Sequence, residues 1–357
     1  AAAVQSSRAD PMAEQLARLR WSDEPPTQNA LDGARAVLGS GRLLGLPTAS
    51  GYVLAGRADD AAALARLPEG RRVRAAVGDA LAGVALAPLA RRLASRYWPG
   101  PLVLELEFAT AGRVALQRTA HAGTAALVEA LGEATLEWVL ARDAEGAAIG
   151  DPDRLEALHG AALGGLADGG ATRLTEAPTA LGLGPGRFEL LDEGLLPIED
   201  LRQTAGLRIL FVCTGNTCRS PMAEAVSRSL LSDRLGTERL ADFGFEVQSA
   251  GVFARSGSPA SEHAVTAAAE LGGDLRQHAS QPATPNLVSG ASRVFCLTRS
   301  HLEALRQALP PGRADHVELL DPDGRDVADP VGGSLEDYRA CAAQITAAIR
   351  TRSTDWA

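Results

Sequence analysis

The chain has 357 residues, 46% of them hydrophobic, and is therefore long enough for about two domains with separate cores. Its formal net charge is −9 and no basic block occurs, which argues against a nucleic-acid or anionic-membrane partner held by bulk electrostatics. All 35 basic residues are arginine, so any chemistry that requires a lysine is excluded.

The first half begins with a polar stretch, residues 1–27, which we expect to form a flexible leader. Residues 30–41 (ALDGARAVLGSG) indicate a helix, and residues 41–48 and 101–108 (PLVLELEF) indicate strands. Residues 187–202 (RFELLDEGLLPIEDLR) indicate a strand, a turn and a short helix. This alternation predicts a first α/β domain.

The second half alternates strictly between strand and helix. Strands are expected at 207–212, 245–251, 292–298 and 316–320, and helices at 221–235, 261–272, 301–309 and 335–350. Strict alternation implies a doubly wound parallel sheet with helices on both faces. A boundary near residue 205 therefore separates a domain at 28–204 from one at 206–357.

The most informative stretch is FVCTGNTCRSP, residues 211–221, where a strand is expected to hand over to a helix. Ligands of such sheets bind beyond the carboxyl ends of strands, and a helix N-terminus adds roughly half a positive charge. Gly215 permits φ values that other residues resist, and Asn216 tolerates left-handed geometry. The loop is thus predicted to cradle a tetrahedral oxyanion. The residues assigned to phosphate binding are Thr214, Gly215, Asn216, Thr217, Cys218 and Ser220.

Two side chains in this loop carry chemistry. The positive field of the loop stabilises the thiolate form of Cys213, which makes it a nucleophile. Arg219 is able to form two parallel charge-assisted hydrogen bonds to a phosphoryl group. A carboxyl on another loop must then protonate the leaving group. This chemistry predicts phosphoryl transfer without a metal or a cofactor.

The four cysteines all lie in the second half, and two of them share one loop: Cys213, Cys218, Cys296 and Cys341. This spacing is unlike a secreted disulfide scaffold and favours a reducing compartment. No apolar stretch approaches the length of a membrane span, and the first residues lack an apolar signal core. We therefore expect a cytoplasmic protein without a membrane partner.

The segment FVCTGNTCRSPMAEA resembles the signature loop of the low-molecular-weight protein-tyrosine-phosphatase family. SAG at 249–251, the DLRQH run and ADPVGGSLEDYRACAAQI from 328 are similar to later blocks of that family, so the resemblance extends over 207–357. It implies that Cys213 is the nucleophile, Arg219 the transition-state clamp and Asp329 the general acid. The alternative acids are Asp321 and Asp326.

The resemblance also implies a buried network that shapes the loop. Its members are Asn216, Ser220, Ser249 and His278. The remaining candidates are interpreted as structural: His263 and His301 as helix or helix-start residues, and Tyr338 as a packing residue on the last helix.

The substrate is predicted from Thr217. Tyrosine phosphatases of the family usually carry a bulky aliphatic residue there, whereas bacterial protein-arginine phosphatases, which this sequence resembles most, carry threonine. A hydroxyl at this position is able to contact the guanidinium side of phosphoarginine, and a smaller polar wall fits a phenyl ring less well. The residue after Asp-Pro, generally aromatic in the family, is Val331 here. The favoured activity is dephosphorylation of phosphoarginine in proteins through a phosphocysteine intermediate; the alternative is a protein-tyrosine-phosphatase.

The first half is similar to threonylcarbamoyl-AMP synthases. GRLLGLPTASGYVLAG at 41–56 resembles their PT-x-T-x-Y-G turn, and YWPGPLVLELE at 97–107 resembles their W-P-G-P-x-T block. The Lys-x-Arg-Pro and Ser-Ala-Asn segments of that family have no equivalent here. We therefore expect a degenerate scaffold at 28–204. A nucleic-acid partner is expected only if this half is active in tRNA threonylcarbamoyladenosine biosynthesis.

Two further functions remain as alternatives. Arsenate reductases resemble this fold and loop, but they need two more cysteines to relay a disulfide, and neither Cys296 nor Cys341 belongs to a close pair in the sequence. A module that captures phosphorylated protein without turnover is opposed by the presence of Cys213, Arg219 and Asp329.

Overall fold

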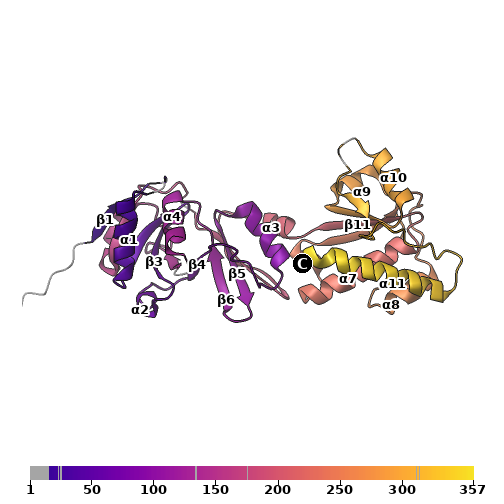
Figure 1. Ribbon diagram of the computed structural model, residues 1–357, viewed down its shortest axis with the longest axis horizontal. Coiled ribbons are helices and arrows are strands. Elements are labelled where there is room, and N and C mark those ends of the chain that lie inside the picture. The colour runs from indigo at the N-terminus through magenta and orange to yellow at the C-terminus, as the bar shows by residue number, and fades with distance from the viewer. Residues whose placement is uncertain are drawn as a thin grey trace, which may run out of the picture. The chain divides into compact units, whose positions relative to one another are not determined.

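The computed structural model describes residues 16–22, 24, 26–132, 135–174, 176–310, 312 and 314–357. The chain forms two compact units, which are described separately below (Figure 1). Unit 1 consists of Ala1–Ala82, Tyr97–Leu181 and Leu190–Leu196, and unit 2 of Gly83–Arg96, Gly182–Glu189 and Pro197–Ala357. The domain limits 28–204 and 206–357 stay predictions.

The first half follows the predicted alternation of strands and helices. Its strands are β1 (Ala17–Arg20), β2 (Leu43–Thr48), β3 (Gly51–Arg57), β4 (Val73–Ala75), β5 (Leu102–Phe108), β6 (Gly112–Gln117), β7 (Leu136–Leu140), β8 (Leu163–Asp168), β9 (Thr179–Gly184) and β10 (Arg187–Asp192). Its helices are α1 (Gln28–Gly39), α2 (Ala61–Leu64), α3 (Ala87–Tyr97), α4 (Ala122–Leu131), α5 (Pro152–His159) and α6 (Ile198–Ala205). Helix α1 begins at 28 because the Thr27 side chain accepts from the Ala30 amide and caps its first turn.

The strands of the first half form one mixed sheet in the order β1-β8-β2-β3-β7-β4-β6-β5-β9-β10. Strand β2 is parallel to β8 and antiparallel to β3, and all its side chains are buried. Residues 1–15 of the expected leader lie outside the described residues. The structure differs from that expectation at β1, which pairs in parallel with β8, so this part of the predicted leader belongs to the sheet.

The second half contains the predicted parallel sheet, in the order β12-β11-β13-β14. The strands are β11 (Arg208–Cys213), β12 (Glu246–Gly251), β13 (Arg293–Cys296) and β14 (Val317–Leu319). The helices are α7 (Arg219–Leu235), α8 (Glu262–Ala269), α9 (Pro285–Gly290), α10 (Arg299–Ala308) and α11 (Leu335–Arg352). Helices α7, α8 and α11 lie on one face of the sheet and α9 and α10 on the other (Figure 1). Helix α9, which begins at Pro285, was not predicted, because its six residues are too few to show a helical pattern in the sequence.

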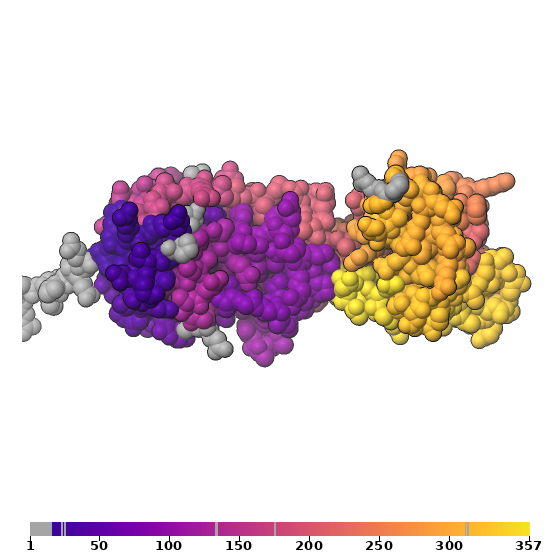
Figure 2. Space-filling view, turned by 45° about the horizontal axis from the view of Figure 1, so that its top comes forward, coloured from indigo at the N-terminus to yellow at the C-terminus, as the bar shows by residue number. Residues whose placement is uncertain are grey.

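The core of unit 2 forms around β11, whose last five residues are all buried, as expected for a central parallel strand covered on both faces. The Phe211 and Phe295 rings stack with centroids 5.7 Å apart. Helix α11, yellow in Figure 2, contributes to the outer surface, and a capping box between Ser334 and Asp337 fixes its start. Among the described residues, no helix is long and apolar enough to cross a membrane.

Candidate active site

The predicted phosphate cradle lies at the carboxyl end of β11, the strand between β12 and β13. Strand β11 ends at Cys213 and helix α7 begins at Arg219, so the residues between them form the loop. No side chain caps the start of α7, which leaves the first amides of this long helix available to an anion. The loop therefore has the position and the field that anion binding requires.

The backbone of the loop turns at Asn216. Asn216 has a φ of 55°, in the left-handed region, whereas Gly215 is not among the residues with positive φ, so the φ freedom of Gly215 is not used. A Cβ at Gly215 would make an ordinary van der Waals contact with Thr217 Oγ1, 3.7 Å away, so there is no steric requirement for glycine here. A Cβ at Gly251 would instead lie 2.5 Å from the Thr214 carbonyl oxygen. The close approach of β12 to the loop therefore requires the glycine of SAG.

The side chain of Asn216 is fully buried and holds the loop from inside. Its Nδ2 donates to Ser220 Oγ (3.0 Å) and Ser249 Oγ (2.8 Å), and its Oδ1 accepts from the Gln281 amide (2.8 Å). Its carbonyl oxygen lies 2.8 Å from His278 Nε2. The other three members of the predicted network, Ser220, Ser249 and His278, thus all contact Asn216. These hydrogen bonds hold its backbone in the left-handed conformation.

The network continues to Glu224 on α7, which the sequence did not single out. Ser249 Oγ donates to Glu224 Oε2 at 2.7 Å. Burial raises the pKa of Glu224, while the Ser249 hydrogen bond and Arg228 act in the opposite direction. The available signal was helical spacing, because Glu224 follows Ser220 by one turn and shares its face of α7.

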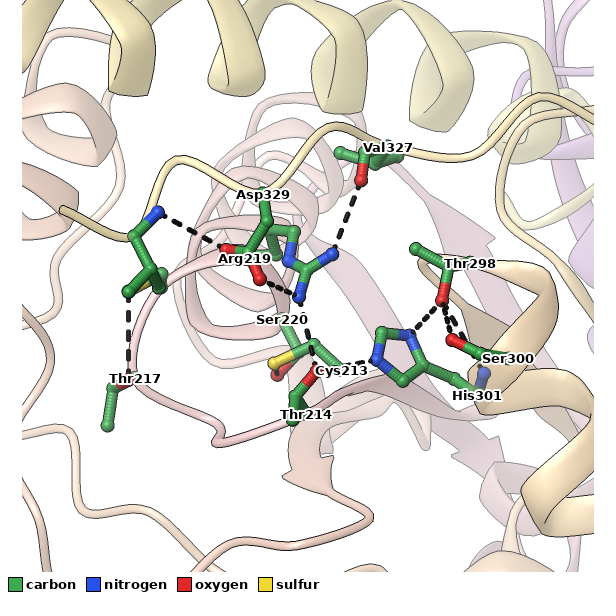
Figure 3. A network of polar contacts seen from close by, with 12 residues as sticks. Cys213, Thr214, Thr217, Arg219, Ser220, Thr298, Ser300, His301, Val327 and Asp329 are labelled. Carbon is green, nitrogen blue, oxygen red and sulfur yellow. Dashed lines mark hydrogen bonds and ion pairs between the residues drawn. The ribbon is translucent and has the colours of Figure 1, made fainter. Parts of the chain in front are cut away.

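Cys213 is a free cysteine with 2% of its surface exposed. Its Sγ lies 2.9 Å from Ser220 Oγ (Figure 3). It also accepts a hydrogen bond from the Asn216 amide at 3.3 Å. Ser220 also has the Ala250 carbonyl within reach, at 3.2 Å, so its proton is able to turn to the sulfur when the thiolate forms. The Cys213 sulfur therefore lies where one backbone amide and one hydroxyl are able to donate to it.

Arg219 is 5% exposed and has three oxygen partners. Nη2 forms an ion pair with Asp329 Oδ2 at 2.6 Å and also donates to Thr214 Oγ1 at 3.2 Å (Figure 3). Nη1 donates to the Val327 carbonyl at 3.3 Å. The structure thus brings the predicted clamp and the predicted acid into direct contact beside the loop.

The two alternative acids have other partners. Asp326 Oδ1 accepts from the Arg299 amide (2.8 Å), and Asp321 Oδ2 accepts from Arg325 Nε (3.0 Å). Asp321 is buried, and its hydrogen bonds to the 323–325 turn hold its pKa below the ordinary value despite its burial. Of the three candidates, Asp329 is the one that contacts Arg219.

Thr217 and Cys218 complete the loop. Thr217 is half-buried, and its carbonyl accepts from the Ser261 amide at 2.9 Å. Cys218 is buried, and its Sγ lies 3.3 Å from the Tyr338 hydroxyl. Burial raises the pKa of Tyr338, and the hydrogen bond to Cys218 raises it further. Tyr338 therefore packs as expected and also contacts the loop through its hydroxyl.

Two exposed apolar side chains flank the loop. Phe253 is 80% exposed, and its amide donates to the Thr214 carbonyl at 3.0 Å. Val331 is 67% exposed, and its amide donates to Asp329 Oδ1 at 3.2 Å. Phe253 was not predicted as a site residue, and its place two residues after SAG was the only local signal. Among the residues that the structure describes, no group of His, Cys, Asp or Glu is arranged to hold a metal ion.

Comparison with known proteins identifies relatives of the second half. The family model described as low molecular weight phosphotyrosine protein phosphatase matches residues 208–354. A protein-arginine-phosphatase of Geobacillus stearothermophilus is 41% identical over 137 residues, which cover 37% of this chain and 84% of that protein. A protein-arginine-phosphatase of Bacillus subtilis is 40% identical over 135 residues (37% and 84%). A probable low molecular weight protein-tyrosine-phosphatase of Ralstonia nicotianae is 34% identical over 130 residues (36% and 82%).

Proposed function

Because the chain belongs to the low molecular weight phosphotyrosine protein phosphatase family and is a phosphatase, we propose that it hydrolyses phosphoarginine in proteins with Cys213 as nucleophile. The observation that carries this proposal is the contact of the buried Cys213 sulfur with the Asn216 amide and the Ser220 hydroxyl, next to the Arg219–Asp329 pair. Phosphorylated protein is the corresponding partner class.

In the first step, the Cys213 thiolate attacks phosphorus, and the bond from phosphorus to the leaving nitrogen breaks. The loop between Cys213 and Arg219 receives the phosphoryl group, whose oxygens take hydrogen bonds from the loop amides. Arg219 exchanges its bond to Asp329 for the equatorial oxygens of the transition state. Asp329, released from the ion pair, takes up a proton from water beside the bound phosphoryl group and gives that proton to the leaving nitrogen.

In the second step, water attacks the phosphocysteine. Asp329, now ionised, takes a proton from that water, and the sulfur–phosphorus bond breaks to return the Cys213 thiolate. The Ser220 hydroxyl stabilises the departing sulfur by donating to it at the observed 2.9 Å separation. Both steps therefore use the same three catalytic side chains and require no metal ion.

The choice of phosphoarginine is supported by the threonine at position 217 of the loop. It is also supported by the two relatives that are protein-arginine-phosphatases. We expect the wild type to act faster on phosphoarginine peptides than on matched phosphotyrosine peptides. Thr217→Ile should move the ratio of the two kcat/KM values toward phosphotyrosine by about 10- to 200-fold, because one polar contact is lost and an apolar wall is added. The measurement is kcat/KM for both peptides, side by side, with both enzymes.

Thr351→Ile is the matched control, because Thr351 is an exposed threonine on α11 whose hydroxyl donates to the Ala347 carbonyl of its own helix. It should leave the ratio unchanged. A wild type that prefers phosphotyrosine would replace the arginine proposal by the tyrosine alternative. A ratio unaffected by Thr217→Ile would move the determinant elsewhere, with Val331 the next position to test.

Arsenate reduction is disfavoured by the state of the other two cysteines. Cys296 is fully buried in β13, and Cys341 is buried in α11. Burial raises the pKa of each thiol to about 12. A disulfide relay needs accessible thiolates, which these environments oppose.

The arginines near residue 72 and one cavity of the first half are a poor match for a nucleotide. The arginines that could take the place of the missing lysine are Arg71, Arg72 and Arg74. Arg71 pairs with Glu105 (2.9 Å) and Asp192, Arg74 pairs with Glu137 (2.6 Å), and Arg72 donates to the Leu64 carbonyl (3.1 Å), so all three are engaged. Among the described residues, a cavity of about 640 Å³ in unit 1 has Arg118 and Glu129 as its only charged lining side chains. One arginine beside a carboxylate is a poor match for a triphosphate.

We therefore expect that residues 28–204 do not make threonylcarbamoyl-AMP. Calorimetry of the full chain with ATP and threonine at millimolar concentration should show no binding, and the Cys213→Ser chain should be used so that no phosphate is turned over. Release of pyrophosphate when bicarbonate is added would contradict this expectation and restore a role in tRNA modification.

A further inference from the structure

His301 lies in the first turn of α10, at the same edge of the sheet as the loop. The chain runs from β13 through Thr298, which caps α10 by accepting from the His301 amide, and this turn places the imidazole against the phosphate loop (Figure 3). The residue is 3% exposed. No step of the proposed mechanism uses it.

Both ring nitrogens of His301 have hydroxyl partners. Nε2 lies 2.9 Å from Thr214 Oγ1, and Nδ1 lies 2.9 Å from Thr298 Oγ1. The Thr214 oxygen also accepts from Arg219 Nη2 at 3.2 Å. Arg219 is therefore connected to α10 through one hydroxyl and one imidazole.

The direction of these hydrogen bonds follows from the groups themselves. Arg219 only donates, so Thr214 must accept from it, and the Thr214 proton remains to be given away. A neutral imidazole with its proton on Nδ1 accepts that proton at Nε2 and donates to Thr298. In this arrangement the Thr214 hydroxyl and the His301 Nδ1–H each have an acceptor, and a lone pair of Thr214 is held toward the guanidinium.

The surroundings of His301 favour the neutral ring. Burial, and after it the charge of Arg219, lower the pKa of His301 to about 4, although Asp329 and Asp326 act in the opposite direction. A second positive charge on the ring would repel Arg219 and turn Nε2 into a donor. We call this chain of hydrogen bonds, from His301 through Thr214 to Arg219, the His301 relay. It is compatible with neutral pH because it requires a neutral imidazole.

We propose that neutral His301 is a positioning residue for Arg219, which it orients through the Thr214 hydroxyl. This inference rests on the proposed role of Arg219 as the phosphoryl clamp. When a phosphoryl group binds, Arg219 gives up Asp329, and the contacts with Thr214 and the Val327 carbonyl are those that remain to hold its guanidinium. The relay therefore acts when the ion pair is broken, which is during catalysis.

The test measures p-nitrophenyl phosphate hydrolysis together with inhibition by inorganic phosphate and by vanadate, a mimic of the trigonal-bipyramidal transition state. His301→Phe should lower kcat by about 10-fold with little change in KM, since it removes one hydrogen bond in the orientation of a charged group. Inhibition by vanadate should weaken by a similar factor, and inhibition by phosphate should weaken less. His301→Gln, whose amide oxygen is able to accept from Thr214, should recover most of the activity.

Thr214→Val gives an independent route to the same contact and remains informative if His301→Phe folds poorly. Because both changes break one relay, the double variant should be no slower than the slower single variant. His316→Phe is the matched control: His316 is a half-buried histidine whose Nε2 contacts the Val288 carbonyl (2.9 Å), away from the loop.

The proposal is overturned if the factors by which Thr214→Val and His301→Phe lower kcat multiply in the double variant. It is also overturned if His301→Phe has the same kcat as His316→Phe. A drop in thermal stability with unchanged kcat would likewise leave His301 a structural residue only. The assay does not depend on the preference for phosphoarginine. If Cys213→Ser instead stays active, the proposed mechanism fails whatever the His301 variants do.

Discussion

Cys213→Ser should abolish turnover, with kcat falling by a factor on the order of 10⁴ or more, because a serine hydroxyl is not ionised near neutral pH and is a far weaker nucleophile. Arg219→Ala should cost about 10³-fold, since it removes the cation that takes the charge of the equatorial oxygens. The two residues act on one transition state, so the double variant should be little worse than Cys213→Ser alone. The measurement is kcat on p-nitrophenyl phosphate.

Matched controls separate chemistry from folding. Cys341→Ser changes another buried cysteine on α11, and Arg325→Ala removes an arginine that pairs with Asp321 outside the loop. Both should keep wild-type kcat. Wild-type activity in Cys213→Ser would contradict the nucleophile assignment, and wild-type activity in Arg219→Ala would contradict the clamp.

Asp329→Asn should slow phosphoarginine and alkyl phosphate substrates by roughly 10²- to 10⁴-fold, because the asparagine amide cannot protonate the leaving group. The loss should be much smaller for p-nitrophenyl phosphate, whose phenolate leaves without a proton. The same change removes the ion pair that occupies Arg219 at 2.6 Å in the ligand-free site. Inorganic phosphate should therefore bind Asp329→Asn at least as tightly as it binds the wild type.

The control for this prediction is Asp326→Asn, because Asp326 caps the Arg299 amide and does not contact Arg219. It should show no dependence on the leaving group. If Asp326→Asn reproduces the leaving-group effect and Asp329→Asn does not, the acid has been assigned to the wrong carboxyl. Equal losses for all leaving groups in Asp329→Asn would mean that Asp329 orients Arg219 rather than transfers a proton.

The Arg219–Asp329 pair gives the ligand-free site a defined resting arrangement. The Asp329 side chain is 47% exposed, so water screens the ion pair and weakens it. The Arg219 side chain is only 6% exposed. The guanidinium is therefore desolvated before substrate arrives, and the carboxylate is the partner that moves. In the proposed mechanism, a phosphoryl group then replaces Asp329 as the anion that pairs with Arg219.

The sequence alone was sufficient to locate the loop and the residues that lie in it. Cys213, Asn216, Arg219 and Ser220 lie within one strand–loop–helix junction, so their contacts follow from local backbone geometry and from the alternation of apolar runs that predicts β11 and α7. The absence of lysine from the sequence likewise shows, without a structure, that the first half has no equivalent of the Lys-x-Arg-Pro segment. The order of the strands in the parallel sheet is harder to predict from the sequence, because the apolar pattern shows where strands lie along the chain and not which strands pair.

Only the tertiary structure decided which distant groups reach the loop. Asp329 is 110 positions from Arg219, and His301 is 87 positions from Thr214, so no local pattern relates them. Asp321 and Asp326 have the same side chain as Asp329, and what separates them is the direction each loop takes after β14. That direction depends on how β13, β14 and α11 pack against β11, since packing brings the carboxyl ends of separate strands to one edge of the sheet.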